Sequence, residues 1–319
     1  MPTMKPKKQE GIPSGSQSCS SQRQKRWMRW AIRIFLFILL VYVGTCVAIA
    51  LMQRSIIFDG VRTQGTPQAQ LRVHAPVQLL HLSLPDGTPV VGIYVPAGAT
   101  RASAAPAPEG ANAPTVLFFY GNGGCMTRCA DVIDLMSNRL GCNVLLVDYP
   151  GYGMSGGNAS ETNCYAAANA ALDWLLAQKD IDQGRIVYVG DSLGAAVAID
   201  LANRRPPEKL ITIGAFTSMS AEARHLLPWL PTSLMLAYRF DNIGKIKNIT
   251  CPVLLLHGTQ DTDVPCGMAR ELAAAARHST LILASGNHNT ITSRISPAWN
   301  DVDAFLRSPI SPANPATQP

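Results

Sequence analysis

Charged side chains are scarce in this sequence: they make up 15% of its 319 residues, whereas 47% of the residues are hydrophobic. This composition excludes an intrinsically disordered chain and favours a globular protein with a sizeable core. The net charge of +6 is also unevenly placed, because eight of the basic residues and only one acid precede position 34. The rest of the chain is close to neutral, so its charge does not favour a nucleic-acid partner.

Motifs that hold metals or nucleotides are missing as well. The sequence has eight cysteines, but it contains no C-x-x-C pair and no neighbouring pair of histidines, which are the spacings typical of a metal site. The glycine-rich segment at 148–155 lacks the Lys-Ser/Thr ending of a phosphate-binding loop, and we interpret it as a structural turn. We therefore expect neither a metal nor a cofactor.

One long run carries no charge at all, from Ile34 to Met52. As a helix it would span about 28 Å, close to the roughly 30 Å of a bilayer core, and it lacks the polar face of a buried core helix. A cleaved signal peptide is the alternative, but the run is long and no small-x-small cleavage site follows it cleanly. We therefore predict an uncleaved transmembrane anchor at residues 30–53.

The basic residues before this anchor predict its orientation, because positive residues stay on the cytoplasmic side of a membrane. The protein is then a single-pass membrane protein whose folded domain lies outside the cytoplasm, on the periplasmic side if the source is bacterial. In that compartment Cys125 and Cys129, four residues apart, can form a disulfide, although two free buried thiols fit the sequence equally well.

Beyond the anchor, short apolar runs alternate with helical patterns, which is typical of a mostly parallel sheet with helices on both faces. Asp86-Gly87 favours a hairpin between the first two runs. We predict eight strands in one sheet, at Val77–Leu84, Pro89–Tyr94, Thr115–Tyr120, Asn143–Val147, Ile186–Val189, Leu210–Ile213, Pro252–Leu256 and Thr280–Leu283. We expect helices near 127–139, 161–178, 193–204, 268–278 and 298–307, and a long loop at 97–113. One α/β domain would thus occupy residues 54–309, between a disordered basic cytoplasmic tail (1–29) with its anchor and a disordered C-terminal tail (310–319).

Polar residues that can act together follow three of these predicted strands. Ser192 lies within Gly190-Asp-Ser-Leu-Gly194, and Asp261 and His288 come after two later strands. Ligands of an open parallel sheet bind beyond the carboxyl ends of its strands, so we expect the three residues to meet there. The order Ser, Asp, His is the one found in nucleophile-elbow hydrolases. We predict Ser192 as the nucleophile, His288 as the general base and Asp261 as the acid that orients the imidazole.

The tetrahedral intermediate of such a reaction needs two backbone N–H donors. Leu193 follows the nucleophile at the start of a predicted helix, and its N–H would supply one of them. We expect the second on the glycine-rich loop after the third strand, from the N–H of Asn122, with Gly123 as the near alternative.

Five motifs in this order resemble those of serine hydrolases with the α/β-hydrolase fold. They are Tyr120-Gly-Asn-Gly-Gly124, the segment 148–155, Gly190-Asp-Ser-Leu-Gly194, the segment His257–Asp261 and Asn287-His288. The resemblance covers roughly residues 55–307. The most similar branch is the membrane-anchored one that resembles serine aminopeptidase S33-like, monoacylglycerol lipase-like and depalmitoylase-like proteins. Tyr120 departs from the family, which usually has a loop-supporting histidine at this position.

The resemblance implies an α/β-hydrolase fold with a mostly parallel eight-stranded sheet, a small helical lid at about 216–248 and a preceding transmembrane helix. It also implies a cofactor-free esterase, thioesterase or lipase acting on a lipid-like or small acyl substrate. Two alternatives are a peptidase or amidase that uses the same three residues, and a catalytically silent binding protein. The family spacing His-Gly-x-x-Asp selects Asp261 over Asp263 as the orienting acid and makes His257 a structural residue.

The lid segment at 216–248 is predominantly apolar, and Pro228 and Pro231 interrupt any single helix within it. A lid that binds an acyl chain and a plain pair of buried helices are both consistent with this pattern. The anchor favours the first interpretation, because it would hold the domain close to lipid.

Overall fold

The structure is a computed structural model, and it describes residues 16–71, 76–99, 113–293 and 295–309 of the chain. Two compact units make up the chain, residues 1–51 and 52–319. Most of the predicted loop at 97–113 lies outside the described residues, as do residues 1–15 of the predicted basic tail and the predicted C-terminal tail at 310–319.

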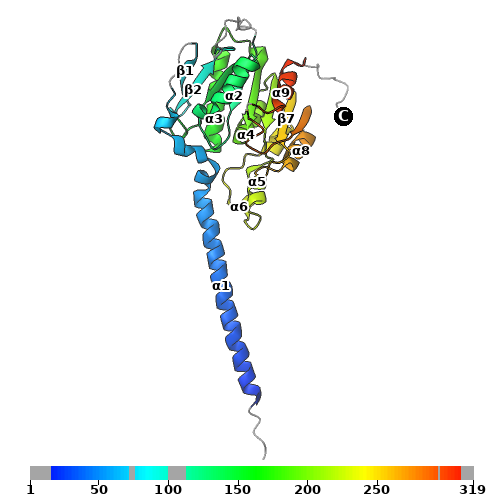
Figure 1. Ribbon diagram of the computed structural model, residues 1–319. Coiled ribbons are helices and arrows are strands. Elements are labelled where there is room, and N and C mark those ends of the chain that lie inside the picture. The colour runs from blue at the N-terminus through cyan, green and yellow to red at the C-terminus, as the bar shows by residue number, and fades with distance from the viewer. Residues whose placement is uncertain (1–15, 72–75, 100–112, 294, 310–319) are drawn as a thin grey trace, which may run out of the picture. The chain divides into compact units, whose positions relative to one another are not determined.

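The first unit consists, in its described part, of most of the long helix α1 (Ser16–Ile57; Figure 1). This helix is long and apolar enough to cross a membrane, and a signal sequence near an N-terminus has the same character. Its start at Ser16 differs from the disordered tail that the polar composition of residues 1–29 predicted. Pro13 and Gly15 are the last proline and glycine before Ser16, and the Gln, Lys, Arg and Met residues that follow favour a helix.

The second unit is built on one sheet of eight strands, as the sequence predicts. The strands are β1 (Gln78–Ser83), β2 (Pro89–Val95), β3 (Thr115–Phe119), β4 (Asn143–Val147), β5 (Ile186–Asp191), β6 (Lys209–Ile213), β7 (Val253–Gly258) and β8 (Ser279–Ala284). Their order in the sheet is β1-β2-β4-β3-β5-β6-β7-β8. The β1–β2 hairpin joins β4 in antiparallel fashion, and β3 to β8 run parallel. Every residue of β3, β4, β6 and β7 is buried, so both faces of the sheet centre are covered.

Helices in two groups cover this sheet (Figure 1). The α-helices are α2 (Ala130–Asp134), α3 (Glu161–Ala177), α4 (Leu193–Arg204), α5 (Met219–Leu226), α6 (Thr232–Met235), α7 (Asn242–Ile246), α8 (Cys266–Ala275) and α9 (Ala298–Arg307). Short 3-10 segments are η1 (Asp59–Thr63), η2 (Pro67–Ala69), η4 (Met126–Cys129) and η6 (Gln183–Arg185), and η5 (Leu135–Arg139) is a π turn. In one group α3 packs on α4, α4 on α7 and α7 on α8. In the other, Arg139 of η5 donates to Asn300 of α9 at 2.6 Å.

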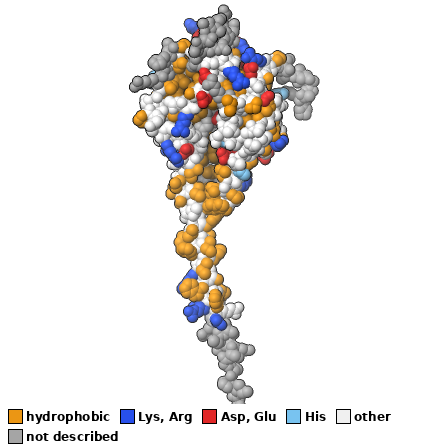
Figure 2. Space-filling view, viewed as in Figure 1, with side chains coloured by type: hydrophobic (Ala, Val, Ile, Leu, Met, Phe, Trp, Pro, Cys, Tyr) orange, Lys and Arg blue, Asp and Glu red, His pale blue; other side chains and the backbone are white. Residues whose placement is uncertain are grey.

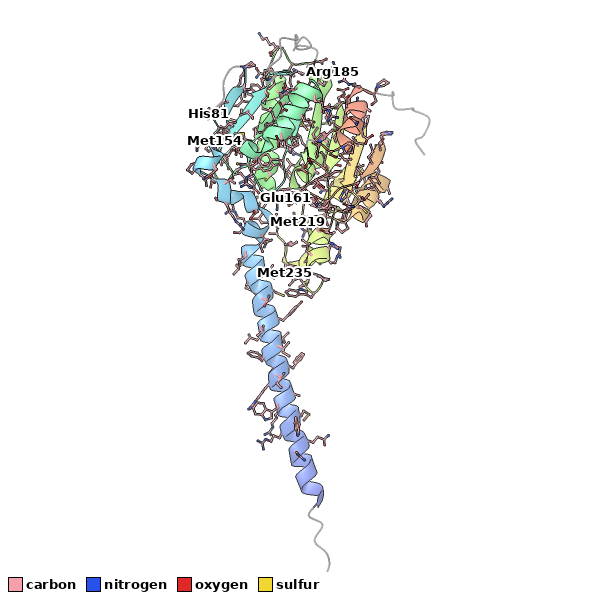
Figure 3. The ribbon with its side chains drawn as sticks, in the orientation of Figure 1. His81, Met154, Glu161, Arg185, Met219 and Met235 are labelled. Carbon is pink, nitrogen blue, oxygen red and sulfur yellow. The ribbon has the colours of Figure 1, made fainter. Side chains whose placement is uncertain are left out.

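The segment predicted as a lid holds the three short helices α5, α6 and α7. Pro228 and Pro231 lie in the interval between α5 and α6, where neither residue could continue a helix. The base of the segment is fixed to the domain, because the N–H groups of Arg239 and Phe240 donate to the carboxylate of Glu161 at 2.7 and 3.0 Å. Figure 3 labels Glu161, together with Met219 at the start of α5 and Met235 at the end of α6.

Candidate active site

Ser192 lies in the sharp turn between β5 and α4. Its backbone has φ 54° and ψ −114°, a conformation that residues with a Cβ seldom adopt. The turn is tied to the end of β6, because the N–H of Ser192 donates to the carbonyl oxygen of Ile213 at 2.8 Å. The strained turn therefore presents the serine hydroxyl at the carboxyl end of the parallel sheet.

Gly190 and Gly194 are required by the close approach of the chain around this turn. A Cβ on Gly190 would lie 2.3 Å from the carbonyl oxygen of Gly194, and one on Gly194 would lie 2.0 Å from the carbonyl oxygen of Phe119. Both distances are far below van der Waals contact, and the atoms concerned belong to the backbone. The Gly-x-Ser-x-Gly pattern thus has a packing reason in addition to the chemistry of its serine.

The three residues predicted to act together do meet at this edge of the sheet. Nε2 of His288 is 2.9 Å from Oγ of Ser192, and Nδ1 of His288 is 2.6 Å from Oδ2 of Asp261. Asp261 is buried, and its Oδ1 accepts the N–H groups of Asp263 and Val264 at 3.0 and 2.8 Å. Asp263 itself is exposed, so Asp261 is the carboxylate that holds the histidine.

The charge of His288 is stabilised by the carboxylates around it. Burial disfavours the imidazolium, but the hydrogen bond and charge of Asp261, helped by Asp191 and Asp263, outweigh burial and raise the pKa of His288 above its ordinary value of about 6.5. Burial, opposed by His288 and reinforced by Asp261, raises the pKa of Asp191 to about 6. A proton taken from Ser192 would therefore be held on His288.

His257 also approaches Asp261 but has different surroundings. It is fully buried at the end of β7, and its Nε2 lies 2.8 Å from the carbonyl oxygen of Val264. Because a carbonyl only accepts, Nε2 carries a proton that it donates there. Burial lowers the pKa of His257, so the ring is a neutral residue that supports the loop carrying Asp261.

The residues predicted to supply the two N–H donors lie on either side of Ser192. Leu193 is the first residue of α4, and N–H groups in the first turn of a helix have no intrahelical acceptor. Asn122 is fixed after β3: its carbonyl oxygen accepts the N–H of Gly60 at 2.7 Å, and its Nδ2 donates to the carbonyl oxygen of Ile57 at 3.2 Å. Asn122 and Gly123 line, with Ser192 and His288, a cavity of about 280 Å³.

Tyr120, the departure from the usual histidine, supports the loop that carries Asn122. Its hydroxyl donates to Oδ1 of Asp148 at 2.9 Å, and its carbonyl oxygen accepts the hydroxyl of Tyr149 at 2.9 Å. Asp148 is completely buried and also accepts the N–H groups of Met126 and Met154, at 2.8 and 2.9 Å. This carboxylate joins the loops after β3 and β4, a role that the sequence pattern did not reveal.

Glu222 of α5 is a second residue that the sequence analysis did not single out. Its Oε2 is buried and has no hydrogen-bond partner among the described residues. Burial, opposed by the charge of His288 and reinforced by Asp261 and Asp263, raises the pKa of Glu222 to about 7. Helix α5 thus lies close enough to His288, Asp261 and Asp263 for their charges to act on Glu222. One signal was present in the sequence, since Glu222 is the only acid between residues 219 and 240.

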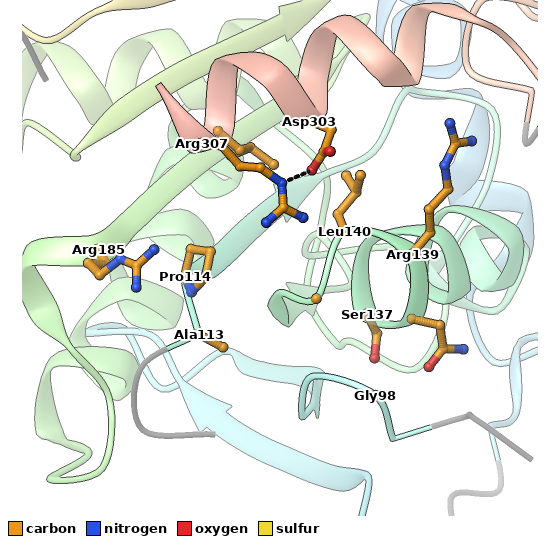
Figure 4. A pocket seen from close by; sticks show the side chains of 12 residues that line it. Gly98, Ala113, Pro114, Ser137, Arg139, Leu140, Arg185, Asp303 and Arg307 are labelled. Carbon is orange, nitrogen blue, oxygen red and sulfur yellow. Dashed lines mark hydrogen bonds and ion pairs between the residues drawn. The ribbon is translucent and has the colours of Figure 1, made fainter. Parts of the chain in front are cut away.

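Other features of the described structure do not indicate a second reactive site. A cavity of about 330 Å³ is lined by Pro114 and Arg185, which precede β3 and β5, so it lies at the amino ends of the strands, away from Ser192 (Figure 4). Among the described residues, no group of three His, Cys, Asp or Glu side chains is arranged to hold a metal ion. Cys125 and Cys129 are free buried thiols.

Comparisons with known proteins agree with this topology. A family model described as alpha/beta hydrolase fold matches residues 114–238, and one described as TAP-like protein matches residues 237–317. The crystal structure of an alpha-beta hydrolase from Vibrio vulnificus matches with a TM-score of 0.63, covering 79% of this chain and 92% of that one at 18% identity. The chain has the α/β-hydrolase fold. The esterase Pf2001 from Pyrococcus furiosus shares this hydrolase fold, with a TM-score of 0.59 over 76% of this chain and 98% of that one, at 18% identity.

A relative closer in sequence is an uncharacterised protein of Mycobacterium tuberculosis. It is 40% identical over 171 residues, which cover 54% of this chain and 60% of that protein. The chain therefore matches less than two thirds of the length of this relative. The two solved hydrolases are too distant in sequence to indicate a substrate, and they support the fold alone.

Proposed function

We propose that this chain is a serine hydrolase that cleaves carboxylic ester or thioester bonds of a lipid-like or small acyl substrate. The observation that carries the proposal is the continuous hydrogen-bonded series from Ser192 through His288 to the buried Asp261, with distances of 2.9 and 2.6 Å. The α/β-hydrolase fold is compatible with this reaction class, and an esterase is among the solved structures that share the fold.

In the proposed reaction, Nε2 of His288 accepts the proton of Ser192 as Oγ attacks the acyl carbonyl carbon. Asp261 keeps the imidazole oriented and stabilises its cation, and His288 then gives the proton to the leaving alcohol or thiol. The N–H groups of Leu193 and Asn122 stabilise the oxyanion. Water, activated by the same histidine, hydrolyses the acyl-enzyme, and no cofactor takes part.

The proposal extends to the setting of the enzyme. Helix α1 would remain as a single-pass membrane anchor, with the catalytic domain at 54–309 outside the cytoplasm, on the periplasmic side in a bacterium. The supporting observations are the uncharged run in α1 and the basic residues that precede it. The apolar lid at 216–248 would bind the acyl chain.

Labelling with a fluorophosphonate tests the proposed nucleophile. Membranes containing the full chain should be labelled, because the probe reacts with activated serine hydroxyls, and Ser192→Ala should abolish the signal. Ser285→Ala, at an exposed serine on the loop that also carries His288, is the matched control and should label fully. An unlabelled wild-type chain would refute the proposed serine hydrolase activity. Equal labelling of Ser192→Ala and wild type would refute the assignment of Ser192 as the nucleophile. Faster cleavage of a p-nitrophenyl ester than of the matching p-nitroanilide would separate esterase from amidase activity.

The activity should fall in acid at a pH set by His288. The base must be neutral to accept the serine proton, and nearby carboxylates raise its pKa above about 6.5. We therefore expect kcat/KM to rise with pH through a midpoint above that value. Asp263→Asn removes one stabilising negative charge, so it should move this midpoint to lower pH while leaving the plateau rate within a few-fold. A midpoint that moves to higher pH in Asp263→Asn would contradict the assignment.

A further inference from the structure

Large apolar side chains are exposed at the tip of the lid. Leu226, Trp229 and Leu234 are 54%, 50% and 87% exposed, and orange side chains gather over this end of the second unit in Figure 2. Among the described residues from 52 onward, the other exposed large apolar side chains are Met52, Ile56 and Ile295. Five of these six residues thus lie either on the lid tip or on the last turns of α1, and scattered surface exposure does not explain such grouping.

The residues that follow the lid tip are bonded to the end of α1 and to the residue after it. Oε1 of Gln53 accepts the N–H of Ala237, two residues after the end of α6, at 2.8 Å. One turn later, the ring of Phe58 packs edge-on against the ring of Tyr238 with centroids 5.0 Å apart. The uncharged run of α1 ends at Met52, one residue before Gln53. A bilayer that accommodated this run would therefore end within a few residues of the contact between Gln53 and Ala237.

The exposed position of the tip is fixed by the fold. Oγ1 of Thr232, the first residue of α6, donates to the carbonyl oxygen of Ser220 in α5 at 3.0 Å. At the base, the N–H of Met219 donates to the carbonyl oxygen of Arg239 at 2.9 Å. These bonds hold α5 and α6 together, so their apolar residues are presented outward as a defined surface.

The charges of the lid are arranged in a way that suits a lipid surface. Arg224, His225 and Arg239 are exposed, whereas Glu222, the only acid between residues 219 and 240, has a buried carboxylate oxygen and lies close enough to His288 for their charges to interact. Aliphatic and tryptophan side chains rimmed by cations are typical of elements that lie in the interface of an anionic membrane. A single helix, α5, thus carries one residue near the catalytic histidine and others on this outer surface.

We propose that the lid tip, residues 226–234, docks into the surface of the lipid bilayer beside α1. This inference rests on the proposed membrane anchor and adds a second point of membrane contact. Docking places the lid between the bilayer and Ser192, so the enzyme takes its acyl substrate from the membrane surface in preference to the aqueous phase.

Fluorescence quenching by lipid tests the docking without relying on catalysis. The full chain is reconstituted into vesicles of phosphatidylcholine and phosphatidylglycerol, with and without bromine atoms on the acyl chains, and collected by flotation. The chain has five tryptophans, so the difference between wild type and Trp229→Phe isolates the emission of Trp229. We expect brominated lipid to quench this difference signal at least two-fold, and quenching should weaken when phosphatidylglycerol is omitted.

The possible results distinguish the docking proposal from the proposed membrane anchor and the proposed hydrolase activity, on which it rests. A chain that does not float with vesicles overturns both the anchor and the docking. A chain that floats with Trp229 unquenched overturns the docking alone, and if it also crosslinks as a dimer through the tip, a second copy is the occupant. Absence of hydrolysis overturns the proposed hydrolase activity, and the quenching result still decides whether the lid tip docks.

A second measurement uses activity with a matched control. Leu226→Ser combined with Leu234→Ser should lower hydrolysis of a long-chain ester held in vesicles by about ten-fold relative to hydrolysis of the same ester dispersed in detergent, because weaker acyl-chain binding by the lid would slow both reactions equally and loss of docking slows only the first. Ile295→Ser replaces an equally exposed apolar residue away from the lid, 90% exposed, and should change neither rate. Equal loss on the ester in vesicles and in detergent, or no loss on either, contradicts docking.

Discussion

Asp261→Asn should lower kcat by about ten-thousand-fold while leaving the fold intact. Asparagine keeps the Oδ1 that accepts the N–H groups of Asp263 and Val264, so the loop after β7 is preserved. It replaces the oxygen 2.6 Å from Nδ1 of His288 with an amide group that donates. The imidazole then favours the tautomer that cannot accept the proton of Ser192 at Nε2, and its cation loses its counter-charge.

The matched control for this change is Asp263→Asn, two residues along the same loop. Asp263 is exposed, and in the described part of the chain the carboxylate hydrogen-bonded to His288 is that of Asp261. Replacement of Asp263 should therefore leave kcat within a few-fold. Steady-state kinetics with a soluble ester, together with circular dichroism to confirm folding, measures both variants. A large loss in Asp263→Asn and a small one in Asp261→Asn would reverse the assignment of the orienting acid.

Gly194→Ala should destabilise the catalytic domain by about 3 kcal/mol or more. The new methyl group would lie 2.0 Å from the carbonyl oxygen of Phe119 and 2.7 Å from that of Tyr120, and neither backbone oxygen can turn away as a side chain could. The melting temperature should fall by roughly 6–12 °C. Because relief of the overlap would move α4, we also expect Ser192 to lose its alignment with His288.

Gly123→Ala is the control for backbone effects of adding a methyl group. A Cβ at Gly123 would meet no atom within 4 Å, and the substitution keeps the N–H group, so the melting temperature should stay nearly unchanged. Thermal unfolding followed by circular dichroism compares the two variants. Equal stability of Gly194→Ala and wild type would mean that the turn is less tightly packed than the structure indicates.

The strands and the meeting of the three candidate site residues could be predicted from the sequence because their signals are local. Each strand of the parallel region is a short apolar run, and Ser192, Asp261 and His288 each follow such a run. A parallel sheet brings its carboxyl ends to one edge regardless of how the strands are ordered. The meeting of these residues therefore required no knowledge of the order in the sheet.

Other features depend on contacts between distant parts of the chain, and the sequence pattern does not contain them. Nothing in the runs themselves places β4 between β2 and β3. Glu222 is brought near the site by the fold of the segment at 216–248, which is held by the bonds of Arg239 and Phe240 to the distant Glu161. The helical stretch predicted near 127–139 is divided into 3-10, α and π segments, since the N–H of Leu140 donates to Leu135, five residues earlier.

The buried carboxylate of Asp148 has a consequence for the energetics of the proposed reaction. It accepts one hydroxyl and one N–H from the loop after β3 and one N–H from the loop after β4, and these bonds form when the domain folds. The loop with Asn122 has therefore lost its conformational entropy before any substrate arrives. Its dipoles are preorganised for a developing negative charge, so little reorganisation energy remains in the barrier to acyl transfer.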